Sequence, residues 1–179
     1  VDPPPFPQTA QRFYFLADAP SFFAVDCVVA SEAGVEPFLE RERHGDPLVY
    51  FDRTSKIRAR AVDRMALAGR RAQRWRQLQG AVPVSAMLVD KELARGRPLE
   101  ALGFYQALLR ALVEVLGMLH RPDRFDFSWR YVETQLPEDA RALLAGYAFI
   151  ADEQALRERA PRLADELRRR LAAAAPPSS

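Results

Sequence analysis

The chain has 179 residues, 49% of them hydrophobic and 28% charged, and a formal net charge of +2 at pH 7. This balance is usual for a soluble globular protein, and the length allows one domain, or one and a half, with a sizeable core. A single cysteine, Cys27, excludes an internal disulfide, fits a reducing cytoplasm and is expected as a buried structural thiol. No signal peptide is visible, and Gln106, Arg110 and Glu114 interrupt the longest apolar stretch. We therefore expect a cytoplasmic protein without a membrane span.

The first third of the chain predicts a small sheet. Residues 1–11 are rich in proline and predict an extended tail. Two runs of β-branched and aromatic residues separated by "ADAPS" predict a hairpin, and a third run follows a short helix that Pro37 opens and Gly45 ends. The predicted elements are strands at 12–16, 22–30 and 47–52 and a helix at 36–45. Since so few elements bury little surface, region 12–54 is predicted to be part of a sheet whose other strands are absent.

Residues 55–173 predict a helical domain, because their apolar positions recur in steps of three and four. Ser55 is expected to cap the first helix, Asp152 to cap the last, and Pro161 to break or kink that last helix near Ala160. Residues 174–179 are expected as a frayed tail. The predicted helices run from Ser55 to Leu78, over Val82–Ala94 up to a stop at Gly96, from Pro98 to Leu119 or His120, briefly from Pro137, and from Asp152.

The run "FFAVDCVVA" places a carboxylate, Asp26, inside an apolar strand. Alternation along the strand puts Asp26 on a mixed face and gives the opposite face, with Phe23, Val25, Cys27 and Val29, to the core. A buried carboxylate needs a partner or a metal. Asp26 is therefore either a cleft residue that serves chemistry, or an edge residue that reaches water or pairs with an arginine.

Polar residues on the helices form a second group of candidates. Gln106, Arg110 and Glu114 are spaced by four along an otherwise apolar helix, so they either form its solvated edge with an Arg–Glu pair or face a cleft where Arg110 holds phosphate oxygens. Lys91 is one of only two lysines in an arginine-rich chain, which suggests a need for a compact ammonium donor.

Two arginine-rich stretches remain open between a binding and a structural role. "HRPDRFDFSWRYV" packs arginines among aromatic residues, and it could grip a nucleotide or form a salt-bridged loop. Residues 56–76 contain eight basic residues and one acidic residue, Asp63. Such a stretch suits nucleic-acid phosphates but more often marks a solvated helix face. There is no phosphate-binding glycine loop, HExxH, CxxC or G-x-S-x-G, and a structural role is favoured for His44 and His120 near helix ends.

Four stretches resemble, in order, the later two-thirds of a bacterial nucleotidyltransferase-like family of the DNA polymerase β-type nucleotidyltransferase superfamily. They are "FYFLADAPSFFAVDCVVA", "FLERERHGDPLVYFDR", "LVDKELARGRPLEALGFYQALLRALVEVL" and "HRPDRFDFSWRYVETQLPEDARALL". The resemblance extends from Arg12 to about Leu171. It implies an α+β fold, with a partial small mixed sheet of the nucleotidyltransferase type followed by a C-terminal helical bundle.

The resemblance also implies an activity and a site. Asp26 matches the third carboxylate that, with an Asp-x-Asp pair, holds two Mg²⁺ ions and directs transfer of NMP from an NTP to a hydroxyl acceptor. Candidate cleft residues in the stretches shared with the family are Lys91, Tyr105, Arg110, Glu114 and Arg130. The acceptor stays open among an aminoglycoside, a tRNA end and a protein side chain.

The sequence departs from the family before Asp26, where the Gly-Ser turn and the Asp-x-Asp pair are absent and only Asp2 and Asp18 occur. One carboxylate cannot hold two Mg²⁺ ions, so this chain as given is not expected to catalyse the transfer. The start at Val1 and the incomplete sheet favour a truncated enzyme. The alternatives are a non-catalytic, antitoxin-type module that binds a protein partner or itself, and a nucleic-acid binder that uses the arginine-rich helix.

Overall fold

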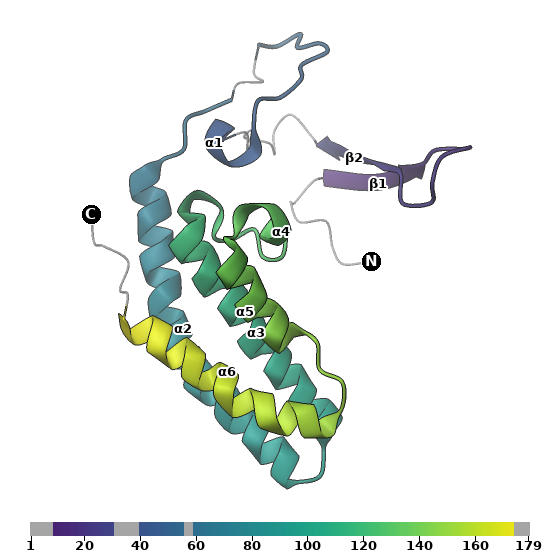
Figure 1. The fold of residues 1–179 in the computed structure, drawn as a ribbon. Coiled ribbons are helices and arrows are strands. Elements are labelled where there is room, and N and C mark those ends of the chain that lie inside the picture. The colour runs from purple at the N-terminus through teal and green to yellow at the C-terminus, as the bar shows by residue number, and fades with distance from the viewer. Residues whose placement is uncertain (1–8, 31–39, 56–58, 174–179) are drawn as a thin grey trace. The chain divides into compact units, whose positions relative to one another are not determined.

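The computed structural model describes residues 9–30, 40–55 and 59–173, and the chain divides into two compact units, Val1–Ala61 and Val62–Ser179. The first unit contains a two-stranded antiparallel sheet, and the second is helical (Figure 1). The expected α+β class with a C-terminal set of helices is therefore confirmed at this level.

The N-terminal unit contains the predicted hairpin. Strand β1 (Thr9–Phe15) pairs antiparallel with β2 (Ala24–Ala30), in a register that places Phe13 opposite Asp26. The connecting loop turns at Asp18, whose φ of 59° is left-handed, a conformation that aspartate tolerates better than most residues. Sequence alternation and turn chemistry were sufficient to predict this element.

The third predicted strand, at 47–52, is wrong. These residues have no strand structure, and Leu48, Tyr50 and Phe51 are largely exposed. A β-rich composition makes a strand only where a neighbouring strand supplies hydrogen bonds, and Glu40 instead forms an isolated parallel bridge with Arg60. The preceding helix, α1 (Arg41–His44), is a single turn that ends at Gly45 with φ 84°, as predicted, whereas Pro37 lies outside the described residues.

The prediction that one face of β2 is core is also wrong. Val25 and Val29 are exposed, and Cys27 is only partly buried instead of being a buried thiol. A two-stranded ribbon has too little area to bury a face by itself, and the described part of this unit adds no second layer of sheet or helix to it.

The first long helix, α2 (Arg64–Ala94), corrects two predictions. It begins nine residues after Ser55, because Asp63 caps it: the Asp63 carboxylate accepts a 2.9 Å hydrogen bond from the Ala66 amide. It also continues through Gly80 and Pro83, where two separate helices were expected. The buried positions of α2 keep their three- and four-residue spacing across this region, so packing outweighs the local cost of Gly and Pro. They are Leu67, Trp75, Leu78, Val82, Ala86, Val89, Glu92 and Leu93.

The remaining helices largely follow the predictions. Helix α3 (Pro98–His120) occupies the expected range, and α5 (Glu138–Ala148) begins directly after Pro137, where a short helix was expected to start. The Asp152 carboxylate caps α6 (Glu153–Ala173) by accepting from the Ala155 amide at 2.7 Å. Helix α6 runs through Pro161 without the expected break near Ala160. Two short elements between α3 and α5 were not predicted: the 3₁₀ turn η1 (Pro122–Arg124) and α4 (Val132–Gln135).

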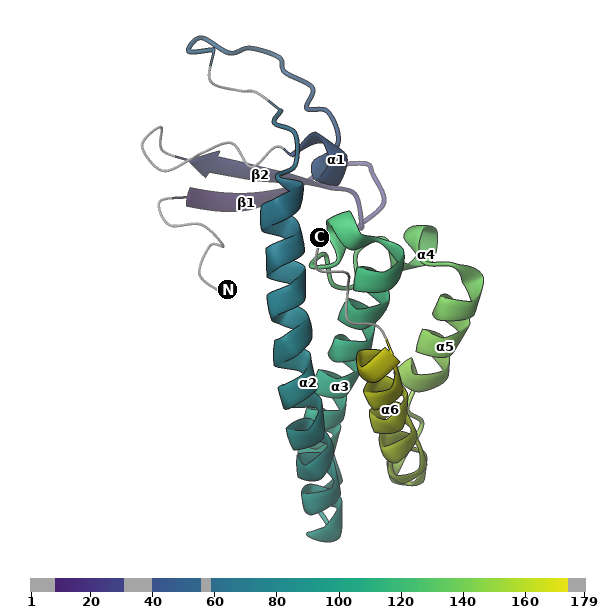
Figure 2. The same cartoon turned by 90° about the vertical axis from the view of Figure 1, so that its left-hand side faces the viewer.

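Helix α3 is the centre of the helical unit. It packs against α2, α5 and α6, and α6 also contacts α2 (Figures 1 and 2). Among the described helices, α3 is the one long and apolar enough to cross a membrane, and 56% of its most apolar stretch is buried within the protein. That burial accounts for its hydrophobicity, since a helix surrounded by others is apolar on most sides.

Candidate functional site

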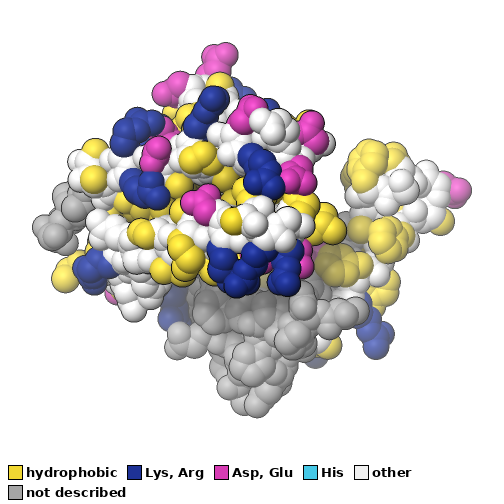
Figure 3. Space-filling view, turned by 90° about the horizontal axis from the view of Figure 1, so that it is seen from below, with side chains coloured by type: hydrophobic (Ala, Val, Ile, Leu, Met, Phe, Trp, Pro, Cys, Tyr) yellow, Lys and Arg dark blue, Asp and Glu magenta, His cyan; other side chains and the backbone are white. Residues whose placement is uncertain are grey.

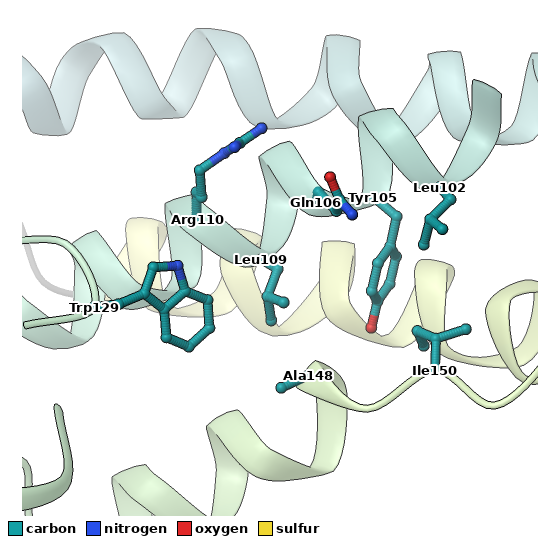
Figure 4. Close-up of a pocket in the computed structure, with 8 residues that line it drawn as sticks. All are labelled: Leu102, Tyr105, Gln106, Leu109, Arg110, Trp129, Ala148 and Ile150. Carbon is teal, nitrogen blue, oxygen red and sulfur yellow. The ribbon is translucent and has the colours of Figure 1, made fainter. Parts of the chain in front are cut away.

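A pocket of about 400 Å³ opens along one side of α3. Trp129 and Tyr105 lie toward its opposite ends, Leu109 lies between them, and Ala148 and Ile150 come from the segment that ends α5 (Figure 4). Such a pocket, largely apolar with a few polar side chains, is the usual form of a small-molecule site. Its lining residues are Leu102, Tyr105, Gln106, Leu109, Arg110, Trp129, Ala148 and Ile150.

Helical periodicity places the α3 residues of this pocket on one side. Leu102, Tyr105 and Leu109 follow each other at steps of three and four, so they lie in a row that points away from α2. Gln106 and Arg110 are one residue further round and form the exposed polar edge. Of the predicted stripe of Gln106, Arg110 and Glu114, the first two line this pocket and Glu114 does not.

Arg110 is the cation of this pocket. It is exposed, and in the part of the chain that the structure describes it has no ion pair or hydrogen bond to another side chain. In Figure 4 its guanidinium extends away from the Trp129 ring. An exposed arginine samples several rotamers at little cost, so this guanidinium is available to an anion at the pocket edge.

Tyr105 contributes its ring, whereas its hydroxyl is already bound. The side chain is 1% exposed, and the hydroxyl donates a 2.7 Å hydrogen bond to the Tyr147 carbonyl oxygen. Burial raises the pKa of Tyr105 to about 12, against a smaller opposing effect of the Arg159 charge. Tyr105 is therefore neutral at physiological pH, and its hydroxyl proton is held by the Tyr147 carbonyl.

Glu114 pairs with a partner that the sequence did not suggest. The Arg74 guanidinium of α2 donates to both carboxylate oxygens of Glu114, at 2.6 and 2.9 Å. The hydrogen bond to Glu114 raises the pKa of Arg74. The expected Arg110–Glu114 pair is thus replaced by a bidentate bridge between α2 and α3, beside a smaller hollow that Arg110 also lines.

Lys91 does not line the α3 pocket. It lies in the last turn of α2, and its ammonium nitrogen is 2.9 Å from a carboxylate oxygen of the buried Glu92. The hydrogen bond from Lys91 holds the pKa of Glu92 below its ordinary value, and the charges of Arg95 and Arg97 act in the same direction. Lys91 therefore stabilises the turn between α2 and α3.

Arg130 lies next to the pocket without lining it. Its guanidinium stacks over the Tyr131 ring at 5.5 Å from the centroid. Trp129, its neighbour in sequence, is the residue that reaches the pocket, and sequence reasoning did not single it out. The signal in the sequence is weak, because single exposed aromatic residues are common on protein surfaces and this chain has several others.

Asp26 belongs to the N-terminal unit and is exposed. Its partner is Gln11 on β1, whose amide nitrogen donates to both Asp26 carboxylate oxygens, at 2.9 and 3.0 Å. Among the described residues, no group of three or more His, Cys, Asp or Glu side chains could hold a metal ion. The residues that the structure describes thus do not supply the carboxylate set that two Mg²⁺ ions require.

The basic residues at 56–76 have different surroundings. Residues 56–58 lie outside the described part and Arg60 precedes α2, while Arg64 pairs with Asp123 at 3.3 Å and Arg74 with Glu114. Figure 3 shows the opposite end of the helical unit, where α2 turns into α3, and there basic and acidic side chains are interspersed. The nucleic-acid interpretation stays a prediction.

Comparison of the chain with protein-family models, with characterised proteins and with solved structures found no significant match.

Proposed function

We propose that this chain is a nucleotidyltransferase-like protein whose helical unit binds a nucleotide in the α3 pocket. The observation that carries the proposal is that one pocket holds both an accessible indole and a guanidinium that has no ion pair with any described residue. Trp129 is 45% exposed and lines the same pocket as Arg110. A nucleotide has the matching chemistry, a flat aromatic base and an anionic phosphate chain.

Each part of the pocket has a role in this proposal. The base stacks on Trp129 and contacts Leu109, as bases commonly do with aromatic side chains. Gln106 offers both a donor and an acceptor to the edge of the base. Arg110 turns toward the phosphates, for which its planar fork of donors is well suited. Gln106 and Arg110 are four residues apart on α3, which supports separate roles for them, Gln106 at the base and Arg110 at the phosphates.

The sequence resemblance supports the same class of ligand and assigns a place to the hairpin, as a remnant of the nucleotidyltransferase sheet. Metal-dependent transfer of NMP to an acceptor needs two carboxylates besides Asp26, and the described residues do not supply them. The proposal for the described residues is therefore nucleotide binding. A cytoplasmic location and an unidentified acceptor belong to the same proposal.

Tryptophan fluorescence tests this proposal directly. Trp75 is buried and its indole N–H has no hydrogen-bond partner in the described part of the chain, so Trp75→Phe removes the second fluorophore together with an unpaired donor. In this variant, titration with ATP, GTP, CTP or UTP is expected to quench Trp129 saturably. Arg110→Ala should weaken the binding roughly tenfold, the value of one charge-assisted contact.

The matched control is Arg76→Ala, which removes an exposed arginine of α2 that does not line the pocket. It should leave the affinity unchanged. Absence of saturable quenching with all four nucleotides would contradict the proposed function. An equal loss in Arg76→Ala would show that the attraction is only the general positive charge of the helices.

A further inference from the structure

The buried guanidinium of Arg121 holds the backbone of the segment that carries Trp129. Arg121, directly after α3, is 6% exposed. Its two terminal nitrogens donate to two backbone carbonyls, Nη1 to that of Arg130 and Nη2 to that of Ser128. These are the carbonyls on either side of Trp129, so a single side chain fixes the backbone position of the pocket's indole.

The backbone of this segment needs such a restraint. Ser128 and Tyr131, at φ 50° and 62°, both adopt the left-handed conformation without being glycine. Conformations of this kind cost of the order of 1 kcal/mol or more each and persist where surrounding contacts impose them. Between them lie Trp129 and Arg130, held in a turn in which the Arg130 amide donates to the Phe127 carbonyl at 3.1 Å.

The other end of the segment is fixed by packing. Phe125 is buried, and its backbone lies so close to Gly117 of α3 that a Cβ on Gly117 would be 3.1 Å from the Phe125 carbonyl oxygen. The chain from Arg121 to Tyr131 is thus held against α3 at Phe125 and again, through Arg121, at Ser128 and Arg130. Trp129 itself stays exposed between these anchors.

The Arg121 guanidinium is a positive charge in a buried environment. Burial lowers its pKa, and the nearby Arg124 lowers it further, while Asp126 opposes both. Its Nε has no hydrogen-bond partner among the described residues. A cation kept in so unfavourable a place is compensated mainly by the two carbonyls that it binds. Lysine cannot replace the two separate guanidinium nitrogens that bind these carbonyls, because its charge and its donors lie on a single nitrogen.

We propose that Arg121 is a positioning residue for ligand binding in the α3 pocket, acting through Trp129 and without contact with the ligand. This inference rests on the proposed function and adds a residue to it that does not line the pocket. Preorganisation is the physical reason: an indole already in place does not lose freedom when a ring stacks on it.

A double-mutant cycle of Arg121→Lys and Trp129→Ala tests the proposal. The variants used for fluorescence also carry Trp75→Phe. Arg121→Lys should lower the steady-state anisotropy of Trp129 without ligand, and should weaken nucleotide binding by about threefold to tenfold. In a Trp129→Ala protein, with binding measured by calorimetry, the same Arg121→Lys change should cause no additional loss. Equal losses with and without Trp129 would overturn the positioning role and leave only general stabilisation.

A measurement on the unmodified protein keeps the proposal falsifiable if Arg121→Lys folds poorly. The Nη protons of Arg121 should give guanidinium signals by NMR that exchange slowly with solvent, unlike those of the exposed Arg110. Rapid exchange at Arg121, or unchanged Trp129 anisotropy in a folded Arg121→Lys variant, would overturn the inference. Failure of every nucleotide to bind the parent protein would overturn the proposed function instead, and the two failures are therefore distinguishable.

Discussion

At the scale of single residues, two of the candidate carboxylates, Asp26 and Glu114, have partners that are not their neighbours in sequence. The Asp26 carboxylate is compensated by the Gln11 amide across the hairpin and by exposure to solvent, so its apolar neighbours in the strand did not imply a buried charge. Glu114 pairs with Arg74, 40 residues away, and not with its helical neighbour. The sequence could propose the groups, whereas only the structure assigns their partners.

Tyr105 makes the stability of the protein depend on pH in the alkaline range. Burial raises its pKa in the folded state to about 12, whereas an unfolded tyrosine titrates near 10. The unfolded state therefore loses its proton first, and the free energy of unfolding should fall as pH rises from about 10 to 12. Below pH 10 this contribution should be complete and constant.

Urea denaturation at several pH values measures this effect. Tyr105→Phe is the control, because it removes the ionisable hydroxyl and retains the ring. The free energy of unfolding of the parent minus that of Tyr105→Phe should be constant up to about pH 9 and should decrease at higher pH. A difference that grows with pH would contradict the assigned direction of the pKa shift.

At the scale of elements, burial decides helix boundaries more than local propensity does. Helix α2 passes through Gly80 and Pro83 and α6 passes through Pro161, because each keeps an unbroken row of buried side chains. The converse holds in the N-terminal unit, where the strand-like run at 47–52 has no pairing partner within 9–30, 40–55 and 59–173 and is irregular. Caps act locally, and Asp152 and Gly45 could be recognised by residue type, whereas Asp63 caps the helix for which Ser55 was expected.

Two glycines of α3 should respond in opposite ways to alanine. Nothing lies within 4 Å of a Cβ placed on Gly103, so Gly103→Ala should stabilise the protein by about 0.5–1 kcal/mol through helix propensity. On Gly117 a Cβ would be 3.1 and 3.2 Å from the Phe125 carbonyl oxygen and Cα. Gly117→Ala should therefore displace the Trp129 segment and cost about 1–3 kcal/mol.

Thermal and urea unfolding of the two variants give the comparison, with far-UV circular dichroism to show that both keep their helices. Each serves as the control for the other, since the substitution and the helix are the same. Stabilisation by Gly117→Ala would show that α3 and the Phe125 backbone are not in close contact.

At the scale of the whole molecule, the hydrophobic core belongs to one of the two units. Among the described residues, every buried apolar side chain lies at Val62 or beyond, and the largest fully buried ones are in α2, α3 and α6. The N-terminal unit instead exposes aromatic side chains such as Phe15 and Phe22. Folding stability of the chain should therefore come from residues 62–173.

Limited trypsin digestion tests this distribution. Brief digestion should cut at the exposed arginines that precede α2, such as Arg53 and Arg60, and leave a resistant fragment that begins near Ala61. This fragment should melt at the same temperature as the intact chain, because it retains the whole described core. A fragment that is degraded further, or that melts well below the intact protein, would show that residues before Val62 stabilise the helical unit.

The sequence by itself determined the hairpin, the extent of α3, the start of α5, the caps at Asp152 and Gly45, and the polar edge of α3 formed by Gln106 and Arg110. These features depend on periodicity and on contacts within a few residues, which a sequence displays directly. Only the tertiary structure decided that α2 is continuous, that Glu114 turns to Arg74, and that Arg121 holds Trp129 at the pocket. Those outcomes depend on which distant segments share a core, and local residue types do not encode that choice.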